Sequence, residues 1–160
     1  MAKSIWFDMD GTIAELYKVD GWLTSLRESD WRVYDRCLPR HNFERINKAI
    51  EALSESGWQV GVITWGSKDI DWGKDLEVIG DVKFDWLCRY FPALADGKFA
   101  CIPYGYSKAQ FLEEMGDGYE VNYLVDDNKE VRHEWRSHGE NFKTINASRA
   151  YVRELEGLVM

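Results

Sequence analysis

Residues 4–12, SIWFDMDGT, join a short apolar run to two carboxylates and a glycine. An apolar run of this length that ends in a polar glycine turn is typical of a buried strand. Because side chains alternate along an extended chain, Asp8 and Asp10 are expected on the same side, and Gly11 permits a sharp exit from the strand. The string D-x-D-G-T arises by chance in roughly a few of every thousand chains of this length. The sequence therefore predicts a strand that ends in a pair of functional carboxylates.

The hydrophobic pattern downstream predicts more strands, in alternation with helices. The first strand covers 4–7, and the others are expected over 58–65, 98–102, 119–125 and 141–145. Helices are expected over 22–28, 42–56, 68–92, 107–115, 129–137 and 148–159. This alternation favours an α/β doubly wound fold with a mostly parallel, five-stranded sheet. In such sheets ligands bind at the carboxyl ends of the strands.

Local signals place some of the helix boundaries. Asn42 is a plausible cap for the helix over 42–56, and Ser107 for the helix over 107–115. The helix over 68–92 is expected to bury an apolar stripe formed by Phe84, Leu87, Cys88 and Phe91. No repeat or Pro/Ser-rich linker divides the chain, so residues 1–160 are predicted to form one domain, with a small cap at about 13–41.

Polar side chains stand at the carboxyl ends of the other predicted strands. Thr64 ends the second strand, and Lys108 opens the helix after the third. Asp126 and Asp127 follow the fourth strand directly. Carboxylates so close together raise each other's pKa unless a cation neutralises them. With Asp8 they offer the hard oxygen ligands that Mg²⁺ prefers.

In this order, the four features resemble the motifs of the haloacid dehalogenase-like (HAD) hydrolase superfamily. The resemblance spans residues 4 to about 128 and implies a Rossmann-like, three-layer α/β/α fold. Lys98 is the alternative to Lys108 for the family's lysine, and Lys108 is preferred because it opens a helix. A second resemblance, to uncharacterised HAD-like proteins of phage and prophage, rests on segments 16–17, 21–23 and 62–68. No function comes with that second group.

The superfamily resemblance implies phosphoryl transfer through an aspartyl-phosphate. Asp8 would be the nucleophile, and Asp10 the general acid and then the general base. Thr64 and Lys108 would hold the phosphoryl oxygens. Mg²⁺ would be bound by Asp8, the backbone carbonyl of Asp10 and Asp126, with Asp127 acting through a water or from the second shell. Dehalogenases of this type lack an acid at the position of Asp10, so the resemblance favours a small-cap phosphatase.

Composition bounds the partners and the compartment. Twenty Lys and Arg against twenty-eight Asp and Glu give a formal charge of −8, which opposes non-specific binding to nucleic acid or anionic lipid. The three scattered cysteines predict neither a disulfide framework nor a zinc site, and no signal-peptide layout or membrane span is recognised. A cytoplasmic protein is expected. The oligomeric state does not follow from the sequence.

The substrate class stays open between several alternatives. A phosphorylated small molecule is expected, and aromatic side chains that could surround the site mouth favour a nucleotide: Trp22, Trp31, Trp65, Trp72 and Tyr104. Trp6, Trp58 and Trp86 are expected in the core. A 5′(3′)-deoxyribonucleotidase-like enzyme and a nucleic-acid-end phosphatase are the alternatives. The second would need a track of basic side chains, for which the candidates are Arg27, Arg32, Arg36, Arg40 and Arg45. We expect these five arginines to be ordinary surface charges. A phosphate- or nucleotide-binding protein without meaningful turnover is the alternative of another class.

Overall fold

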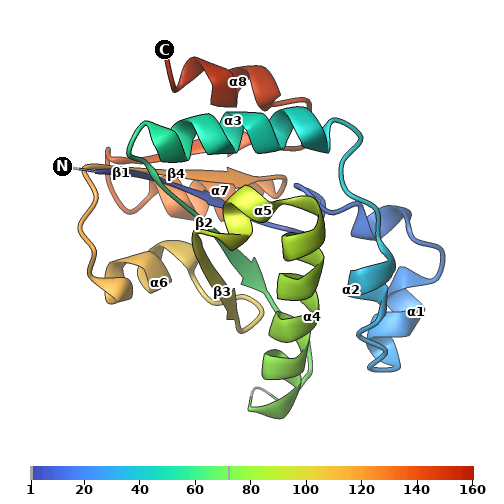
Figure 1. The fold of residues 1–160 in the computed structure, drawn as a ribbon. Helices are drawn as coiled ribbons and strands as arrows, with labels where there is room; N and C mark the ends of the chain where they lie inside the picture. Colours follow the sequence, from blue (N-terminus) through green and yellow to red (C-terminus); the bar gives the residue numbers. More distant parts are fainter. Residues whose placement is uncertain (1, 72) are drawn as a thin grey trace.

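The computed structural model describes residues 2–71 and 73–160, and its centre is a five-stranded sheet in the order β3-β2-β1-β4-β5 (Figure 1). Every pair of neighbouring strands is parallel. The strands are β1 (Lys3–Phe7), β2 (Gln59–Trp65), β3 (Lys98–Ile102), β4 (Val121–Asp126) and β5 (Phe142–Asn146). The predicted parallel α/β sheet is confirmed, with each strand boundary within two residues of its expected position.

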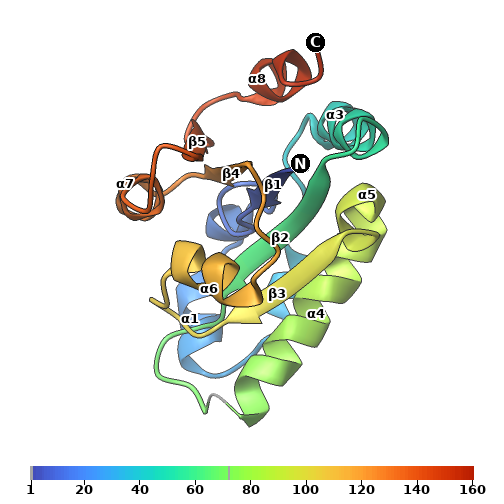
Figure 2. The same cartoon turned by 90° about the vertical axis from the view of Figure 1, so that its left-hand side faces the viewer.

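Helices cover both faces of this sheet, which gives the predicted three layers (Figure 2). One face packs against α3 (Phe43–Glu55), α4 (Lys74–Tyr90), α5 (Pro92–Ala95) and α8 (Val152–Gly157). The other packs against α6 (Lys108–Met115) and α7 (Lys129–Arg136). Alternation along the strands supplies both cores: Phe7 and Val62 face the first layer, while Trp6 and Ile63 face the second. Burial on both faces explains why these strands are continuously apolar.

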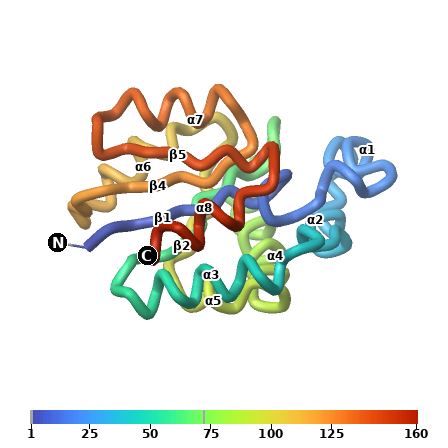
Figure 3. The backbone as a smooth tube through the Cα atoms, turned by 90° about the horizontal axis from the view of Figure 1, so that it is seen from above, coloured from blue at the N-terminus to red at the C-terminus, as the bar shows by residue number. Residues whose placement is uncertain are grey.

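The segment over 13–41, called the cap segment below, lies beyond the carboxyl end of the sheet, beside α4 (Figure 3). It contains a 3-10 turn, η1 (Leu16–Lys18), and the short helices α1 (Trp22–Arg27) and α2 (Val33–Arg36). Leu16, Val33 and Tyr34 are buried in a small core with Ile79 of α4. The indole N–H of Trp86 donates to the carbonyl of Cys37 at 2.8 Å. These contacts fix the segment over the end of the sheet where the candidate site lies.

The predicted helix over 68–92 is wrong at its start. Residues 66–71 form a loop, and α4 begins only at Lys74. The carboxylate of Asp71 accepts the backbone N–H of Gly73 at 2.9 Å, so a polar turn precedes the helix. The helix over 148–159 is likewise shorter and covers only Val152–Gly157.

Two further expectations about the helices are wrong. Cys88 is exposed, and the buried face of α4 instead carries Ile79, Lys83, Trp86 and Leu87. Asn42 does not cap α3 through its side chain, whereas Ser107 does cap α6 by accepting the N–H of Gln110 at 3.0 Å. Met1 and Trp72 lie outside the described residues. Among the residues described, no helix is long and apolar enough to cross a membrane.

Candidate functional site

The sheet order brings the predicted site residues together. β1 lies between β2 and β4, so the carboxyl ends of these three strands are adjacent. Phe7 is in register with Val125, and the N–H of Asp8 donates to the carbonyl of Val125 at 3.0 Å. Asp8 therefore stands directly beside Asp126, although the two residues are far apart in the sequence.

The turn after Asp8 is held by Gly11 and Thr12. Gly11 has a φ of +82°, in the left-handed region that glycine adopts readily, and it forms the sharp exit from β1 that the sequence predicted. The hydroxyl of Thr12 lies 3.1 Å from a carboxylate oxygen of Asp8, and it accepts the N–H of Asp127 at 3.2 Å. The end of β1 and the end of β4 are thus tied to each other through one hydroxyl.

Gly11→Ala is expected to destabilise the protein and to displace Asp127. A Cβ at Gly11 would lie 2.4 Å from Oδ2 of Asp127, in addition to the left-handed backbone cost of about 1–2 kcal/mol. Gly116→Ala is the matched control, because Gly116 has a φ of +73° and no heavy atom within 4 Å of its ideal Cβ. Urea unfolding should show the larger loss for Gly11→Ala. Equal losses of unfolding free energy in the two variants would show that a Cβ at position 11 does not clash with Asp127.

Three carboxylates and one ammonium form the centre of the site. Single oxygens of Asp8, Asp126 and Asp127 all lie within 4.8 Å of one another. The Nζ of Lys108 donates to Asp8 and to Asp126, both at 2.9 Å, and its side chain is 2 % exposed. Lys98, the alternative lysine, instead pairs with Asp117. The structure therefore places Lys108 beside Asp8.

The charges at this centre do not balance. Burial raises the pKa of Asp126 and that of Asp127, and the charge of Asp8 raises both further. Burial alone would lower the pKa of Lys108, but the carboxylates of Asp126 and Asp8 raise it above its usual range. Lys108 therefore stays charged, and the cluster keeps an excess of negative charge that a bound cation would neutralise.

The side chain of Asp10 lies outside this cluster and pairs with a lysine that the sequence analysis missed. The Nζ of Lys83, on α4, donates to Oδ2 of Asp10 at 2.9 Å, to the Thr64 hydroxyl at 2.9 Å and to the Trp65 carbonyl at 2.8 Å. Lys83 is 1 % exposed. Burial raises the pKa of Asp10, and the charge of Lys83 opposes that rise. Lys83 thus links the end of β2 to the acidic turn after β1.

Lys83 left a weak signal in the sequence. It stands four residues after Ile79 and three before Trp86, on the buried face of α4. A lysine in an apolar helical stripe is rarely fully buried unless it is paired. A lysine within that apolar stripe therefore indicates that a carboxylate faces the lysine.

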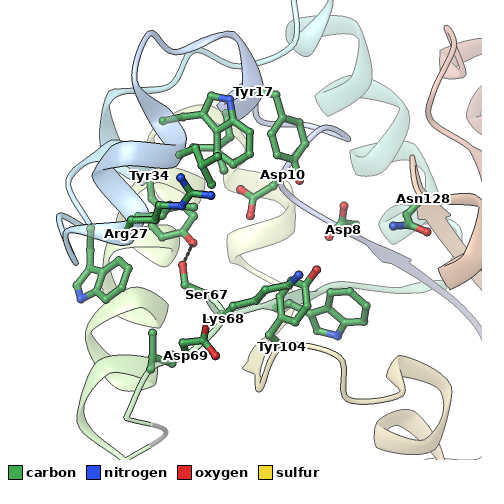
Figure 4. A pocket seen from close by; sticks show the side chains of 18 of the residues that line it. Asp8, Asp10, Tyr17, Arg27, Tyr34, Ser67, Lys68, Asp69, Tyr104 and Asn128 are labelled. Atoms are coloured by element: carbon green, nitrogen blue, oxygen red, sulfur yellow. Dashed lines mark hydrogen bonds between the residues drawn. The ribbon is translucent and has the colours of Figure 1, made fainter.

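A pocket of about 570 Å³ extends from Asp8 to the cap segment (Figure 4). Its size lies within the roughly 300–1,000 Å³ of small-molecule sites. Of the aromatics expected at the mouth, the pocket is lined by Trp22, Trp31, Trp65 and Tyr104, while Trp72 lies outside the described residues. Trp6 and Trp86 are buried in the core as predicted, but Trp58 is only partly buried, against Tyr123.

The five arginines considered for a basic track are mostly engaged elsewhere. Arg32 and Arg36 pair with Asp30, and Arg45 pairs with Glu156. Arg40 donates to backbone carbonyls, including that of Thr12 at 2.9 Å. Arg27 lines the pocket. These contacts favour the expectation of ordinary surface charges over that of a nucleic-acid track.

Comparison with known proteins supports the fold. Searches found no matching family model and no matching curated protein. Among solved structures, the chain is similar to a crystal structure described as that of a putative haloacid dehalogenase-like hydrolase from Burkholderia xenovorans LB400. The TM-score is 0.54 at 10 % identity, over 99 % of this chain and 95 % of that chain. The likeness spans the whole chain, and it shows that the chain has the HAD-like fold predicted from its motifs.

Proposed function

We propose that this protein is a Mg²⁺-dependent phosphatase that hydrolyses phosphate monoesters through an aspartyl-phosphate on Asp8. The observation that carries this proposal is the position of the Asp8 carboxylate. It contacts the ammonium of Lys108, and it lies within 4.8 Å of Asp126 and Asp127 at the carboxyl end of the sheet. A carboxylate nucleophile, a fixed cation and further carboxylates for a metal are the groups that this chemistry needs.

The first half of the reaction would transfer the phosphoryl group to the protein. An oxygen of Asp8 attacks phosphorus in line, and the bond to the leaving oxygen breaks as the new bond forms. Asp10, whose pKa is raised by burial, enters this step in its protonated form and gives that proton to the leaving oxygen. The carboxylate that remains on Asp10 is stabilised by Lys83, 2.9 Å away. In the second half, Asp10 takes a proton from a water that attacks phosphorus, which frees Asp8 and releases inorganic phosphate.

Lys108 and Thr64 would hold the phosphoryl oxygens. The Nζ of Lys108 already donates to Asp8, so a phosphoryl group attacked by Asp8 would lie within reach of the same ammonium. The hydroxyl of Thr64 accepts from Lys83 and has no other partner among the described residues, which leaves its own proton free to donate. Both donors are fixed before substrate arrives, as preorganised charge stabilisation requires.

The donor set fits Mg²⁺. Asp8, Asp126 and Asp127 offer hard oxygen ligands, and one lysine does not neutralise three carboxylates. A bound Mg²⁺ would polarise the phosphoryl group and offset its repulsion by these acids. An oxygen of Asp127 lies within 4.8 Å of oxygens of Asp8 and Asp126, which favours direct binding of the metal by the Asp127 carboxylate over binding through a water. The Asp10 carboxylate would serve in proton transfer.

Metal should stabilise the protein more at neutral than at acid pH. The pKa values of Asp126 and Asp127 are raised in the folded, metal-free protein. The folded state therefore holds protons that the unfolded state loses above about pH 4, so the metal-free protein loses stability as the pH rises towards neutrality. Mg²⁺ binds the ionised carboxylates, so its effect on the melting temperature should grow over the same range. A melting-temperature shift that is equal at pH 5 and pH 7.5 would contradict this assignment.

Hydrolysis of p-nitrophenyl phosphate tests the proposal. Turnover is expected with Mg²⁺, and it should be lost with EDTA and return when Mg²⁺ is added in excess. A panel of nucleoside monophosphates then separates a nucleotidase from a general phosphatase. A folded protein that binds Mg²⁺ and phosphate but turns over none of these compounds would overturn the proposal in favour of a binding protein.

A further inference from the structure

One wall of the pocket carries two ammonium groups on two packed aromatic rings. The Nζ of Lys108 lies 5.3 Å from the Trp65 ring centroid, and the Trp65 and Tyr104 centroids are 5.0 Å apart. The Nζ of Lys68 lies 4.9 Å from the Tyr104 centroid. Trp65 is itself fixed, because its indole N–H donates to the carbonyl of Tyr106 at 2.9 Å. Cation–π contacts of this kind hold both amines against the wall, one beside Asp8 and one further out.

A third cation enters the pocket from the cap segment. Arg27, at the end of α1, points into the cavity at the end away from Asp8 (Figure 4). Within residues 2–71 and 73–160, neither Arg27 nor Lys68 has an ion pair, whereas Arg32, Arg45 and Arg89 each pair with a carboxylate. Beyond Lys108, the pocket therefore presents two cations that make no ion pair within the described residues, Arg27 at the outer end and Lys68 on the wall beside Tyr104.

The acids that line the pocket do not cancel these cations. Asp8, Asp126 and Asp127 belong to the cluster at the inner end, and Asp10 is paired with Lys83. The remaining acid is Asp69, which lies beside Lys68 in the loop after β2 (Figure 4). Two cations against one carboxylate leave the pocket beyond the acidic cluster with an excess of positive charge.

The space between the two ends is bordered by apolar side chains of the cap segment. Trp22, Leu23 and Leu26 line the pocket together with Tyr17, whose ring packs edge-on against Trp22 at 4.9 Å. Tyr17 is 52 % exposed and Leu23 is 42 % exposed, although both face a cavity. An apolar or planar ligand body laid along this wall would cover surface that is open to water without ligand.

From this arrangement we infer that the pocket selects a phosphate monoester that carries a second anionic group at the far end of an apolar or planar body. The inference rests on the proposed function, since the first phosphate is placed at Asp8 and Lys108. The second anion is bound by Arg27 at the outer end, while Lys68 adds positive charge from the wall beside Tyr104. The body lies against Tyr17 and Trp22. A pocket of about 570 Å³ has room for the whole ligand, well beyond one phosphoryl group.

Two substrate pairs that differ in the second anion test the inference. Phenyl phosphate is compared with 4-carboxyphenyl phosphate, and again with 1,4-phenylene bisphosphate, so that the second anion stands at the far end of the ring in both pairs. In at least one pair, kcat/KM should favour the two-anion member by about 10- to 100-fold, as expected for charge-assisted hydrogen bonds. The pair that shows the preference identifies the preferred second anion as a carboxylate or as a phosphate. No preference in either pair would overturn the inference.

A double variant assigns the preference to its residues. In Arg27→Met/Lys68→Met the ratio of the two kcat/KM values should fall to about one, since only the two-anion member loses a partner. The matched control is Lys48→Met/Arg153→Met, which removes the same charges from exposed positions on α3 and α8. The control should keep the wild-type ratio. A ratio that survives in the pocket variant, or collapses in the control, would contradict the assignment.

Calorimetric titration of the same compounds, with Mg²⁺ present, separates this inference from the proposed function. Tighter binding of the two-anion member without turnover of any compound would refute the phosphatase and keep the second-anion site. Turnover of both members at equal kcat/KM would keep the phosphatase and refute the second-anion site. Neither binding nor turnover would refute both.

Discussion

Asp8→Asn should lower the rate of p-nitrophenyl phosphate hydrolysis by at least about 10³-fold, because it removes the proposed nucleophile. An amide oxygen does not attack phosphorus at a useful rate, and Lys108 and Thr64 do not replace the lost bond-forming step. The fold should survive, since asparagine keeps the shape of the side chain and Lys108 keeps Asp126 as a partner at 2.9 Å. Loss of one carboxylate also relieves repulsion within the acidic cluster.

Initial rates and thermal unfolding of the same samples give the measurement. Asp117→Asn is the matched control, because Asp117 also pairs with a lysine, Lys98, but lies outside the pocket. The control should retain full activity. Turnover near the wild-type rate in folded Asp8→Asn would remove Asp8 from the mechanism.

Lys83→Met should be the most damaging substitution of a residue outside the motifs. It leaves the Asp10 carboxylate without its counter-ion and the Thr64 hydroxyl without its donor. Breaking a buried ion pair on one side costs about 3–5 kcal/mol, and a value near 3 is expected because the Asp10 side chain is 19 % exposed. Hydrolysis should slow as well, since Asp10 loses the cation that stabilises its ionised form.

A double-mutant cycle of Lys83→Met, Asp10→Asn and Asp10→Asn/Lys83→Met separates this pair from the rest of the core. Asp10→Asn/Lys83→Met removes both charges, so its free energy of unfolding should exceed that of Lys83→Met. Lys98→Met, which breaks the exposed pair with Asp117, should cost no more than about 1 kcal/mol. Urea unfolding measures all of these. A Lys83→Met protein as stable as Lys98→Met would show that the buried pair contributes little.

The sheet and most of the site were predictable because they depend on local chemistry. Short apolar runs mark strands that are buried on both faces, and a parallel sheet brings the ends of such strands to one edge. That rule alone places Asp8, Thr64 and Asp126 together. Lys108 could be chosen over Lys98 because it follows the helix cap Ser107, and the structure places it against Asp8.

The features that were missed depend on tertiary contacts. Lys83 can be buried because Asp10 neutralises its charge and Thr64 accepts a hydrogen bond from it, and both residues are distant in sequence. Residue type alone predicts a lysine at the surface. Asparagine is a common N-cap residue, but the side chain of Asn42 makes no capping hydrogen bond. Residues 66–71 form a loop against the cap segment, where Ser67 and Tyr34 share a hydrogen bond of 2.6 Å. Such contacts override local helix propensity.

The covalent intermediate is the central claim, and it can be trapped directly. The protein is mixed with Mg²⁺ and a phosphate monoester, quenched with acid and reduced with borohydride, which converts an aspartyl-phosphate to homoserine. Peptide mass spectrometry should find homoserine at position 8 in the wild-type protein and at no other aspartate, with none in Asp8→Asn. Active turnover without any homoserine at position 8, or with homoserine at another aspartate, would contradict the account.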